Sequence, residues 1–236
     1  MIDLHCHILP CVDDGAANTD ETLELLQMEA EQGVEAVCFT PHLREGMFTT
    51  PDEKIREAFQ RILRIADERG ITPALYLSRE YHYDSLFLRK LEEGTLLPMG
   101  ARRVLLLEFS YTSDFDTLRN AAEQVMDRGY TPMFAHVERY RVIQREPGLA
   151  KALSRAGVII QVNADSILGL DGWRIRRACN HLMDERAIHV VASDAHDPAS
   201  RAVNLKKCGE YLIRRIGRAN TRRILRDNPC EILANE

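Results

Sequence analysis

Residues 2–15, "IDLHCHILPCVDDG", combine histidines and carboxylates directly after an apolar opening. Alternate residues of an extended strand share a face, so His5 and His7 can direct both imidazoles to one ion. Asp13 and Asp14 follow in the expected loop. Imidazoles and carboxylates are common ligands of divalent cations in hydrolytic centres, so this stretch predicts a metal site.

Comparable residues end five of the other six apolar strands that the sequence predicts: His42, Glu80, Glu108, His136, and the pair Asp194 and His196 in "SDAH". The last pair repeats the alternate spacing of the N-terminal histidines. Carboxylates at the edge of apolar strands lose hydration and, when they converge, repel one another. Divalent cations offset both effects, and a ligand set without sulfur suits manganese, iron or zinc. As a group, these residues predict a multinuclear hydrolytic centre.

The remaining three histidines have other expected positions. His189 stands at the start of the last predicted strand, the wrong end for the site, and is interpreted as structural. His181 falls within a helical pattern and is expected to be solvated. His82 has the same orientation as Glu80 in an extended strand, so it could line the site.

Seven short apolar strands are predicted between helical stretches, at 1–8, 35–42, 74–83, 104–110, 131–140, 158–165 and 188–196. Near-continuous apolar runs are typical of strands buried on both faces of a parallel sheet. Helical patterns fill 18–33, 50–70, 84–93, 114–129, 147–157, 171–187 and much of 199–235. This alternation predicts one α/β domain over residues 1–236, closed into a barrel or opened as a sheet. In a barrel, the candidate residues would share the rim at the C-terminal ends of the strands.

Two helix starts carry capping signals. Asn18 with Glu21 three residues later predicts a capping box. Thr50 with Glu53 predicts a second one, with Pro51 at the first helical position.

Composition excludes several classes of protein. The formal net charge of −5 argues against a nucleic-acid-binding protein, although three bound divalent cations would bring that total to about +1. No apolar run approaches the ~18 residues of a membrane span, and a strand pattern at the N-terminus leaves no room for a secretory signal. The six cysteines form no C-x-x-C pair, which favours neither a zinc ribbon nor a disulfide framework. A reducing cytoplasm is the expected location.

The spacing of a cysteine-based phosphatase, Cys-x5-Arg, occurs in "CFTPHLR" (38–44) and again in "CGEYLIR" (208–214), inside a predicted helix. A phosphate-binding loop of that kind presents a row of backbone N–H groups. Pro41 removes one of them, and no glycine is present in the first stretch. Cys38 stands within an apolar strand, which would raise the pKa of its thiol. A cysteine nucleophile is therefore not expected.

The ordered series "DLHCH", "VDDG", "TPH", a lone Glu on the third strand, "LLEFS", "AHVERY" and "SDAH" resembles the PHP (polymerase and histidinol phosphatase) superfamily over essentially the whole chain. "GMF" with "PDEKI" and "HVERY" are similar to its bacterial manganese-dependent protein tyrosine phosphatases, encoded with capsule and exopolysaccharide genes. The resemblance implies a distorted TIM-like (β/α)7 barrel that holds three divalent metal ions, with manganese preferred and iron, zinc, cobalt or magnesium as alternatives.

The resemblance also implies a ligand set for each ion. The first ion would be held by His5, His7, Glu80 and Asp194. The second would be held by Glu80 as a bridge, Glu108 and His136. The third would be held by Asp14, His42 and His196. Arg44, Arg139 and Arg201 correspond to the family's phosphate-binding arginines.

Two positions depart from the family pattern. Arg79 stands where small residues are usual, and His82 replaces an aromatic residue. Either side chain could change the mouth of the pocket and with it the substrate preference.

The expected reaction is hydrolysis of phosphotyrosine by a hydroxide that two metal ions supply near neutral pH. His42 or His196 could lend a proton to the leaving group. The resemblance implies a phosphoprotein substrate, the tyrosine autokinase of polysaccharide synthesis.

Other functions remain open at this point. The nearest is a small-molecule phosphoesterase such as histidinol phosphatase. A metal-stabilised binding protein without catalysis is another. An amidohydrolase is disfavoured, because Glu108 and Asn163 stand where a bridging lysine and a histidine would be expected.

Overall fold

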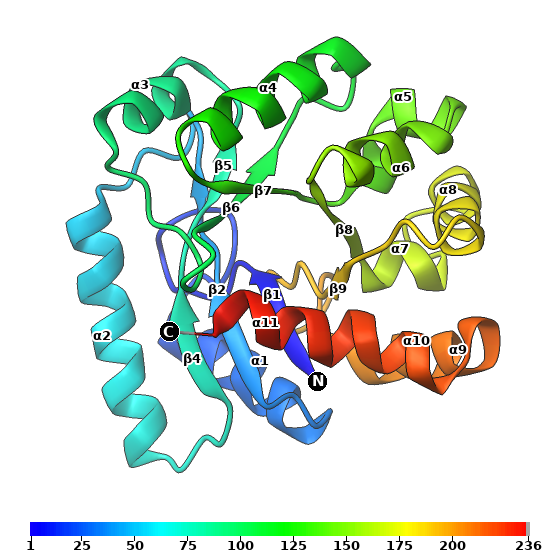
Figure 1. The fold of residues 1–236 in the computed structure, drawn as a ribbon. Helices are drawn as coiled ribbons and strands as arrows, with labels where there is room; N and C mark the ends of the chain where they lie inside the picture. Colours follow the sequence, from blue (N-terminus) through cyan, green and yellow to red (C-terminus); the bar gives the residue numbers. More distant parts are fainter. Residues whose placement is uncertain (235–236) are drawn as a thin grey trace.

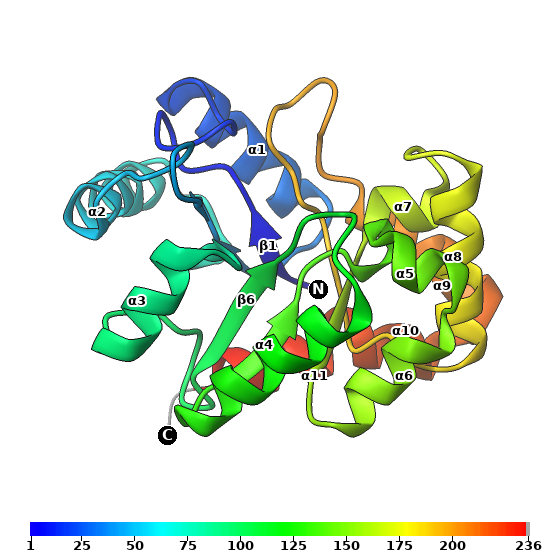
Figure 2. The same ribbon diagram turned by 90° about the horizontal axis from the view of Figure 1, so that it is seen from above.

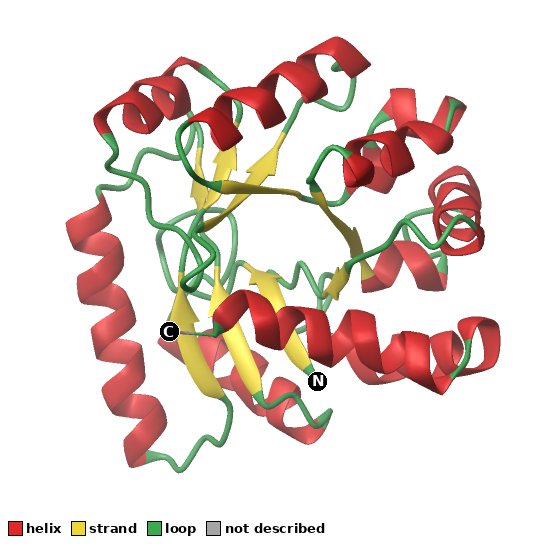
Figure 3. Cartoon of the chain, in the orientation of Figure 1, coloured by secondary structure: helices red, strands yellow, loops and turns green. Residues whose placement is uncertain are grey.

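The computed structural model describes residues 1–234 and shows an α/β fold with a curled parallel sheet (Figures 1 and 3). Its strands are β1 (Ile2–Cys6), β2 (Ala36–Phe39), β3 (His42–Leu43), β4 (Ala74–Leu77), β5 (Glu80–His82), β6 (Val104–Glu108), β7 (Thr131–Phe134), β8 (Ile159–Asn163) and β9 (Val190–Ala192). Hydrogen bonds join them in the orders β1-β2-β4 and β3-β5-β6-β7-β8-β9, and every pair is parallel. All seven predicted strand segments are therefore present in the predicted sheet type.

Two predicted strands are each broken in the middle. The segment 35–42 becomes β2 and β3, which lie in different sheets, with Thr40 and Pro41 between them. Pro41 has no N–H for a strand ladder, and the Thr40 hydroxyl is within 3.1–3.2 Å of the backbone N and O of Cys6. The segment 74–83 likewise breaks at Ser78 and Arg79 into β4 and β5. The Ser78 hydroxyl donates to the Leu97 carbonyl, and the Arg79 guanidinium donates to Asp52 and to the carbonyl of His42 in β3.

The predicted strands 131–140 and 188–196 end earlier than expected. After β7, His136 adopts a left-handed conformation (φ 34°) and opens a 3₁₀ turn, η1 (Val137–Arg139). After β9, Asp194 also has a positive φ of 54°. At each of these two residues the chain leaves the strand and the following loop begins.

The helices cover the outside of the sheet (Figures 1 and 2). They are α1 (Thr19–Glu31), α2 (Asp52–Glu68), α3 (Ser85–Glu93), α4 (Phe115–Asp127), α5 (Arg141–Arg145), α6 (Gly148–Arg155), α7 (Ala164–Leu168), α8 (Trp173–Asp184), α9 (Leu205–Ile216), α10 (Arg218–Arg222), a π turn η2 (Arg223–Asp227) and α11 (Asn228–Leu233). The short helices α5 and α7 and the turn η1 were not predicted. Among the described residues, none of these helices is both long and apolar enough to cross a membrane.

The capping prediction is confirmed for α1 and wrong for α2. Asn18 Oδ1 accepts from Glu21 N at 3.0 Å, and Glu21 Oε2 accepts the backbone N–H of Ala17, the residue before the N-cap, at 2.8 Å. At α2, Pro51 occupies the N-cap position and no side chain caps the helix. The Thr50 hydroxyl donates instead to the carbonyl of Val12, a tertiary bond that the local pattern does not encode.

Alternate residues of the strands enter two apolar clusters. Leu105 and Leu107 join the larger cluster with the helices, whereas Leu106 packs with Leu4, Met133 and Ile232 in a smaller one. The strands are therefore buried on both faces, as parallel strands are when helices cover them. Among the candidate ligands, Glu108 ends β6, whereas His42 and Glu80 begin the short strands β3 and β5 that follow the two breaks.

Candidate metal centre

His5 and His7 face each other at the end of β1, with their Nε2 atoms 3.1 Å apart. The other ring nitrogen of each contacts an acceptor: His5 Nδ1 lies 3.2 Å from Gln161 Oε1, and His7 Nδ1 lies 2.8 Å from Asp13 Oδ2. Gln161 Oε1 also accepts the backbone N–H of His136, which fixes the orientation of the amide. Both Nδ1 atoms therefore carry hydrogens, and in the neutral rings both Nε2 atoms present lone pairs to the same point.

Glu80, at the start of β5, stands at the centre of this group and is fully buried. Its Oε2 lies 3.0 Å from His42 Nδ1, 3.2 Å from His7 Nε2 and 3.3 Å from His5 Nε2. Its Oε1 lies 3.0 Å from His136 Nε2. Despite this proximity, Glu80 Oε2 and His42 Nδ1 have no partner with hydrogen-bond geometry among the described residues. A cation among these atoms would satisfy them, because buried polar atoms otherwise require hydrogen bonds.

Asp194 completes the floor of the site. Its Oδ1 lies 3.5 Å from the Nε2 atoms of both His5 and His7. Its Oδ2 accepts from Asn163 Nδ2 at 2.7 Å and from the guanidinium groups of Arg139 at 3.3 Å and Arg201 at 3.2 Å. One carboxylate therefore faces the histidines while its other oxygen holds two arginines beside them.

A further group lies toward solvent. Asp14 Oδ1 is 3.6 Å from His42 Nε2 and 3.7 Å from His196 Nε2, and the Asp14 side chain is 49% exposed. His196 Nε2 is buried and has no hydrogen-bond partner among the described residues.

Three sets of ligand atoms lie within 4.8 Å of one another: His5, His7 and Glu80; His42, Glu80 and Glu108; and His7, Asp14, His42 and His196. They share members with the three predicted ligand sets. Asp194 and His136 fall outside the three groups but contact them at the distances given above, and His136 Nε2 lies 4.0 Å from Glu108 Oε2. The assignment of individual ligands to individual ions stays a prediction.

The electrostatics of the site are strongly coupled. Burial and the nearby His42 oppose protonation of His7, but Asp13 and Glu80 outweigh them and raise the pKa of His7 to about 9. Burial also opposes protonation of His42, whose pKa is raised to about 9 by Glu80 and Glu108. Burial and His7 lower the pKa of His196 to about 2. Burial disfavours the Asp194 carboxylate, yet His5, His196 and the two arginines hold its pKa well below the ordinary value. Cationic charge, from protons or from metal ions, thus stabilises the carboxylates here.

A pocket of about 310 Å³ opens above these residues. Nine of the twelve predicted site residues line it: Asp14, His42, Arg44, Glu80, Glu108, His136, Arg139, Asp194 and Arg201. The other three, His5, His7 and His196, are buried in contact with them. Met47, Phe48 and Tyr111 complete the lining and give it an apolar rim, with the Phe48 ring stacked on His42 at 5.1 Å.

Residues 1–234 match the family model for capsular polysaccharide synthesis, CpsB/CapC. The chain belongs to the CpsB/CapC family. This confirms the family resemblance inferred from the sequence.

Several relatives of this CpsB/CapC chain carry the name tyrosine-protein phosphatase. CpsB of Streptococcus pneumoniae is 29% identical over all of this chain and 99% of its own length. YwqE of Bacillus subtilis is 31% identical over 85% of this chain and 79% of its own. A crystal structure from work on these two proteins, described as unique metal-dependent tyrosine phosphatases, superposes with a TM-score of 0.91 at 27% identity, over 99% of this chain and 94% of that one. A lactonase from Listeria monocytogenes, with a TM-score of 0.64 and 11% identity, shares the fold alone.

The sequence did not predict several residues of this CpsB/CapC site that contact the predicted ligands or arginines and hold them in position. Gln161 contacts His5 and His136, and Asn163 bonds Asp194. Asp171 pairs with Arg139 at 3.2 Å. Asp13 was noted only as a loop residue, yet its Oδ2 contacts His7 and accepts the backbone N–H of His42 at 2.9 Å. The polar Gln161 and Asn163 in "VIIQVNAD" were a usable signal, because they interrupt an otherwise apolar strand.

The two positions that depart from the family pattern lie away from the pocket lining. The Arg79 guanidinium is buried and donates to Asp52 at 2.6 Å and to the carbonyl of His42 at 2.6 Å, so it ties α2 to β3. His82 Nδ1 lies 3.2 Å from Glu108 Oε1, so it contacts a candidate ligand without lining the pocket. The idea that Arg79 changes the pocket mouth is therefore wrong.

The residues that were not expected to bind metal or act as a nucleophile have the predicted environments. His181 is exposed on α8, and His189 Nδ1 accepts the backbone N–H of Ile160. Cys38 is buried, which raises the pKa of its thiol.

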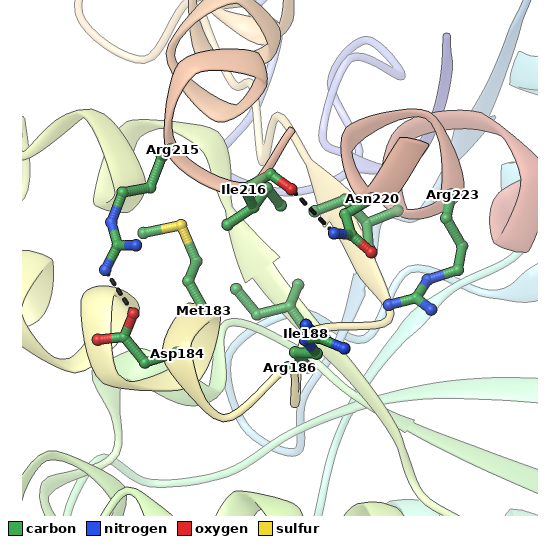
Figure 4. A pocket seen from close by; sticks show the side chains of 9 residues that line it. Met183, Asp184, Arg186, Ile188, Arg215, Ile216, Asn220 and Arg223 are labelled. Atoms are coloured by element: carbon green, nitrogen blue, oxygen red, sulfur yellow. Dashed lines mark hydrogen bonds and ion pairs between the residues drawn. The ribbon is translucent and has the colours of Figure 1, made fainter. Parts of the chain in front are cut away.

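A separate cavity of about 310 Å³ lies between the end of α8 and the C-terminal helices (Figure 4). Ile188, Ile216 and Ile224 give it an apolar lining, and an Arg215–Asp184 ion pair stands at its side. None of its lining residues is a predicted ligand or a predicted phosphate-binding arginine, so this cavity is not part of the site.

Proposed function

We propose that this chain is a metal-dependent protein tyrosine phosphatase of capsular or exopolysaccharide synthesis. The observation that carries the proposal is the single pocket in which nine predicted site residues meet an apolar rim. The names of the CpsB and YwqE relatives support the same activity.

The donor set fits divalent cations. The lone pairs of His5 Nε2 and His7 Nε2 converge beside Glu80 Oε2, a carboxylate oxygen without a hydrogen bond among the described residues. We propose three ions, held by the three predicted ligand sets on a distorted (β/α)7 barrel. Nitrogen and oxygen donors without sulfur favour manganese, with iron, zinc, cobalt or magnesium as alternatives. When bound, such cations lower the pKa of water to about 7 and offset phosphoryl charge.

The arginines are positioned to bind the phosphoryl group. Arg139 and Arg201 both donate to Asp194 Oδ2, and together with Arg44 they line the pocket. Guanidinium groups bind phosphate oxygens through paired, charge-assisted hydrogen bonds. Asp171 also accepts from Arg139 and limits the directions in which that side chain can move.

The apolar rim of the pocket suits a substrate with an aromatic leaving group. Met47 and Tyr111 are large apolar side chains, 60% and 48% exposed, beside a pocket otherwise lined by polar groups. With Phe48 they can contact the ring of a phosphotyrosine. A tyrosyl group, with a pKa of about 10, leaves with less protonation than an alkyl alcohol needs. Of the two histidines predicted to lend a proton, His42 lines the pocket and His196 does not, so we propose His42 as the donor.

The test compares substrates with and without metal. The purified protein should hydrolyse p-nitrophenyl phosphate and phosphotyrosine peptides with manganese and lose this turnover with a chelator. His5→Asn should remove the activity, whereas His181→Asn, which alters an exposed histidine of α8, should retain it. Absence of metal-dependent turnover would favour a binding protein. Faster turnover of histidinol phosphate than of phosphotyrosine peptides would favour a small-molecule phosphoesterase.

The physiological substrate follows from the family context. We propose the tyrosine autokinase of polysaccharide synthesis in the cytoplasm. Deletion of the gene should raise tyrosine phosphorylation of that kinase. Loss of phosphatase activity in the His5→Asn variant should have the same effect.

A further inference from the structure

A cationic groove lies between the short helix α5 and the start of α8. It has a volume of about 540 Å³ and is lined by Arg141, Gln144, Arg145, Trp173, Arg174 and Arg177. Figures 1 and 2 show α5 and α8 side by side in both views, and the two helices pack together. We call this surface the arginine groove.

The four arginines of the groove are exposed, and none of them forms an ion pair with an acidic group of the described residues. The ion pairs among residues 1–234 include Arg139, Arg201 and Arg215 but none of these four. Four cations on two adjacent helices repel one another when no anion lies between them. They also contrast with the chain as a whole, whose formal net charge is −5. The groove is therefore complementary to an anion with more than one charge.

An aromatic side chain stands among these cations. Trp173 is 69% exposed, and the Arg174 guanidinium lies 5.5 Å from the centroid of its ring. Indole rings stack on other aromatic rings, and guanidinium groups bind phosphate in a bidentate manner. Together, these groups suit a ligand that carries both an aromatic ring and a phosphate.

The groove adjoins the candidate metal centre. Helix α5 begins two residues after Arg139, and α8 begins two residues after Asp171, the partner of Arg139. Gln144 Nε2 also donates to the carbonyls of Glu138 at 2.9 Å and Arg139 at 3.3 Å. Both walls of the groove thus start beside an ion pair whose arginine lines the pocket.

We propose that the arginine groove binds a second phosphotyrosine of the substrate chain while the first occupies the pocket. This inference rests on the proposed phosphatase function and specifies its substrate class as multiply phosphorylated chains. A phosphotyrosine carries a charge of about −1.5 to −2 and an aromatic ring, whereas glutamate carries one charge and no ring. The groove therefore distinguishes the two.

Kinetics with matched peptides test the proposal. The substrates are a peptide with one phosphotyrosine, peptides with a second one after spacers of increasing length, and peptides with glutamate in the second position. For the best spacer, the second phosphotyrosine should lower KM by about tenfold, the value of one charge-assisted hydrogen bond. The double variant Arg145→Ala/Arg177→Ala should lose this difference and keep its turnover of p-nitrophenyl phosphate. Arg61→Ala/Arg64→Ala, two exposed arginines of α2, is the control and should behave as wild type.

Binding is measured separately from activity. Trp173 is the only tryptophan in the chain, so its fluorescence reports on the groove directly. Peptides with non-hydrolysable phosphotyrosine analogues should change this fluorescence when they carry two such groups, and Arg145→Ala/Arg177→Ala should abolish the change. If wild type hydrolyses neither p-nitrophenyl phosphate nor any peptide, the proposed function fails, and the fluorescence titration still decides whether the groove binds phosphotyrosine.

Three results would overturn the inference. One is an equal KM for singly and doubly phosphorylated peptides at every spacer length. Another is a glutamate peptide that matches the doubly phosphorylated one, because the groove would then respond to charge alone. The third is tighter binding of a single-stranded oligonucleotide than of the doubly phosphorylated peptide.

Discussion

Asp13→Asn tests whether the candidate centre depends on groups that are not themselves predicted ligands. The Asp13 side chain is fully buried. Its Oδ2 contacts His7 Nδ1 at 2.8 Å and accepts the backbone N–H of His42 at 2.9 Å, and its Oδ1 accepts that of Gly15 at 3.1 Å. Asparagine preserves the shape but lacks the charge and one acceptor oxygen. His7 would then lose the partner that directs its Nε2 lone pair into the site.

The size of the effect follows from the electrostatics. Burial raises the pKa of Asp13, but His7 and the bond from His42 outweigh it and lower the pKa from 3.8 to about 2. That shift corresponds to about 2 kcal/mol of preference for the charged carboxylate. Losing a carboxylate that orients a metal-binding histidine costs roughly 10–100-fold in metal affinity, which is of the same order. We expect Asp13→Asn to weaken manganese binding by that factor and to lower kcat/KM in parallel when metal is limiting.

Isothermal titration with manganese, in competition with a chelator, measures this change. Asp20→Asn, on the exposed side of α1, is the control. Asp14→Asn provides a contrast, since this predicted direct ligand should lower the number of bound ions and leave the affinity of the others unchanged. The reasoning is refuted if Asp13→Asn binds manganese as tightly as Asp20→Asn does.

The Asp13 carboxylate also makes the free energy of unfolding depend on pH, in a direction that follows from its pKa shift. Its folded pKa lies below the unfolded value, so its contribution to the free energy of unfolding is present above about pH 3.8. That contribution is lost as the pH falls through about 2. The difference in unfolding free energy between metal-free wild type and Asp13→Asn should therefore close over this range.

Further variants test the other parts of the site and the core. Arg201→Ala should lower kcat/KM for p-nitrophenyl phosphate by about 10²-fold, as loss of a donor to transition-state charge does, while Arg61→Ala should leave it unchanged. Replacement of all six cysteines by serine should retain metal-dependent turnover, and loss of turnover with metals still bound would contradict a mechanism without a cysteine nucleophile. Phe134→Ala, which truncates a fully buried ring on β7, should lower the free energy of unfolding by about 3–5 kcal/mol in urea titrations.

Much of the fold and the grouping of the candidate residues could be predicted because both depend on strong local patterns. Apolar runs located every strand, and the period-two spacing of His5 and His7 placed both Nε2 atoms on one side of β1. Parallel strands then bring their C-terminal ends to one rim, which is why residues as distant as Asp14 and His196 lie together.

The parts that could not be predicted depend on tertiary contacts. The division of 35–42 into two strands involves the Thr40 hydroxyl, which bonds Cys6 on a neighbouring strand. The early end of β7 depends on the left-handed conformation of His136, whose N–H is held by Gln161 from β8. Positioning residues such as Asp171 carry no spacing signal, because their partners come from other elements.

The curled sheet and the candidate site share the same backbone hydrogen bonds. Where β1 meets the chain after β9, Asp194 N donates to the His5 carbonyl at 2.8 Å, and His7 N donates to the Ala195 carbonyl at 2.8 Å. The residues that join the two ends of the curl are thus predicted ligands or their immediate neighbours. Asp194 adopts a φ of 54° at this junction, a conformation that costs a non-glycine residue free energy. Because the same turn directs its carboxylate toward His5 and His7, the binding of a cation there would stabilise the junction as well as the carboxylate.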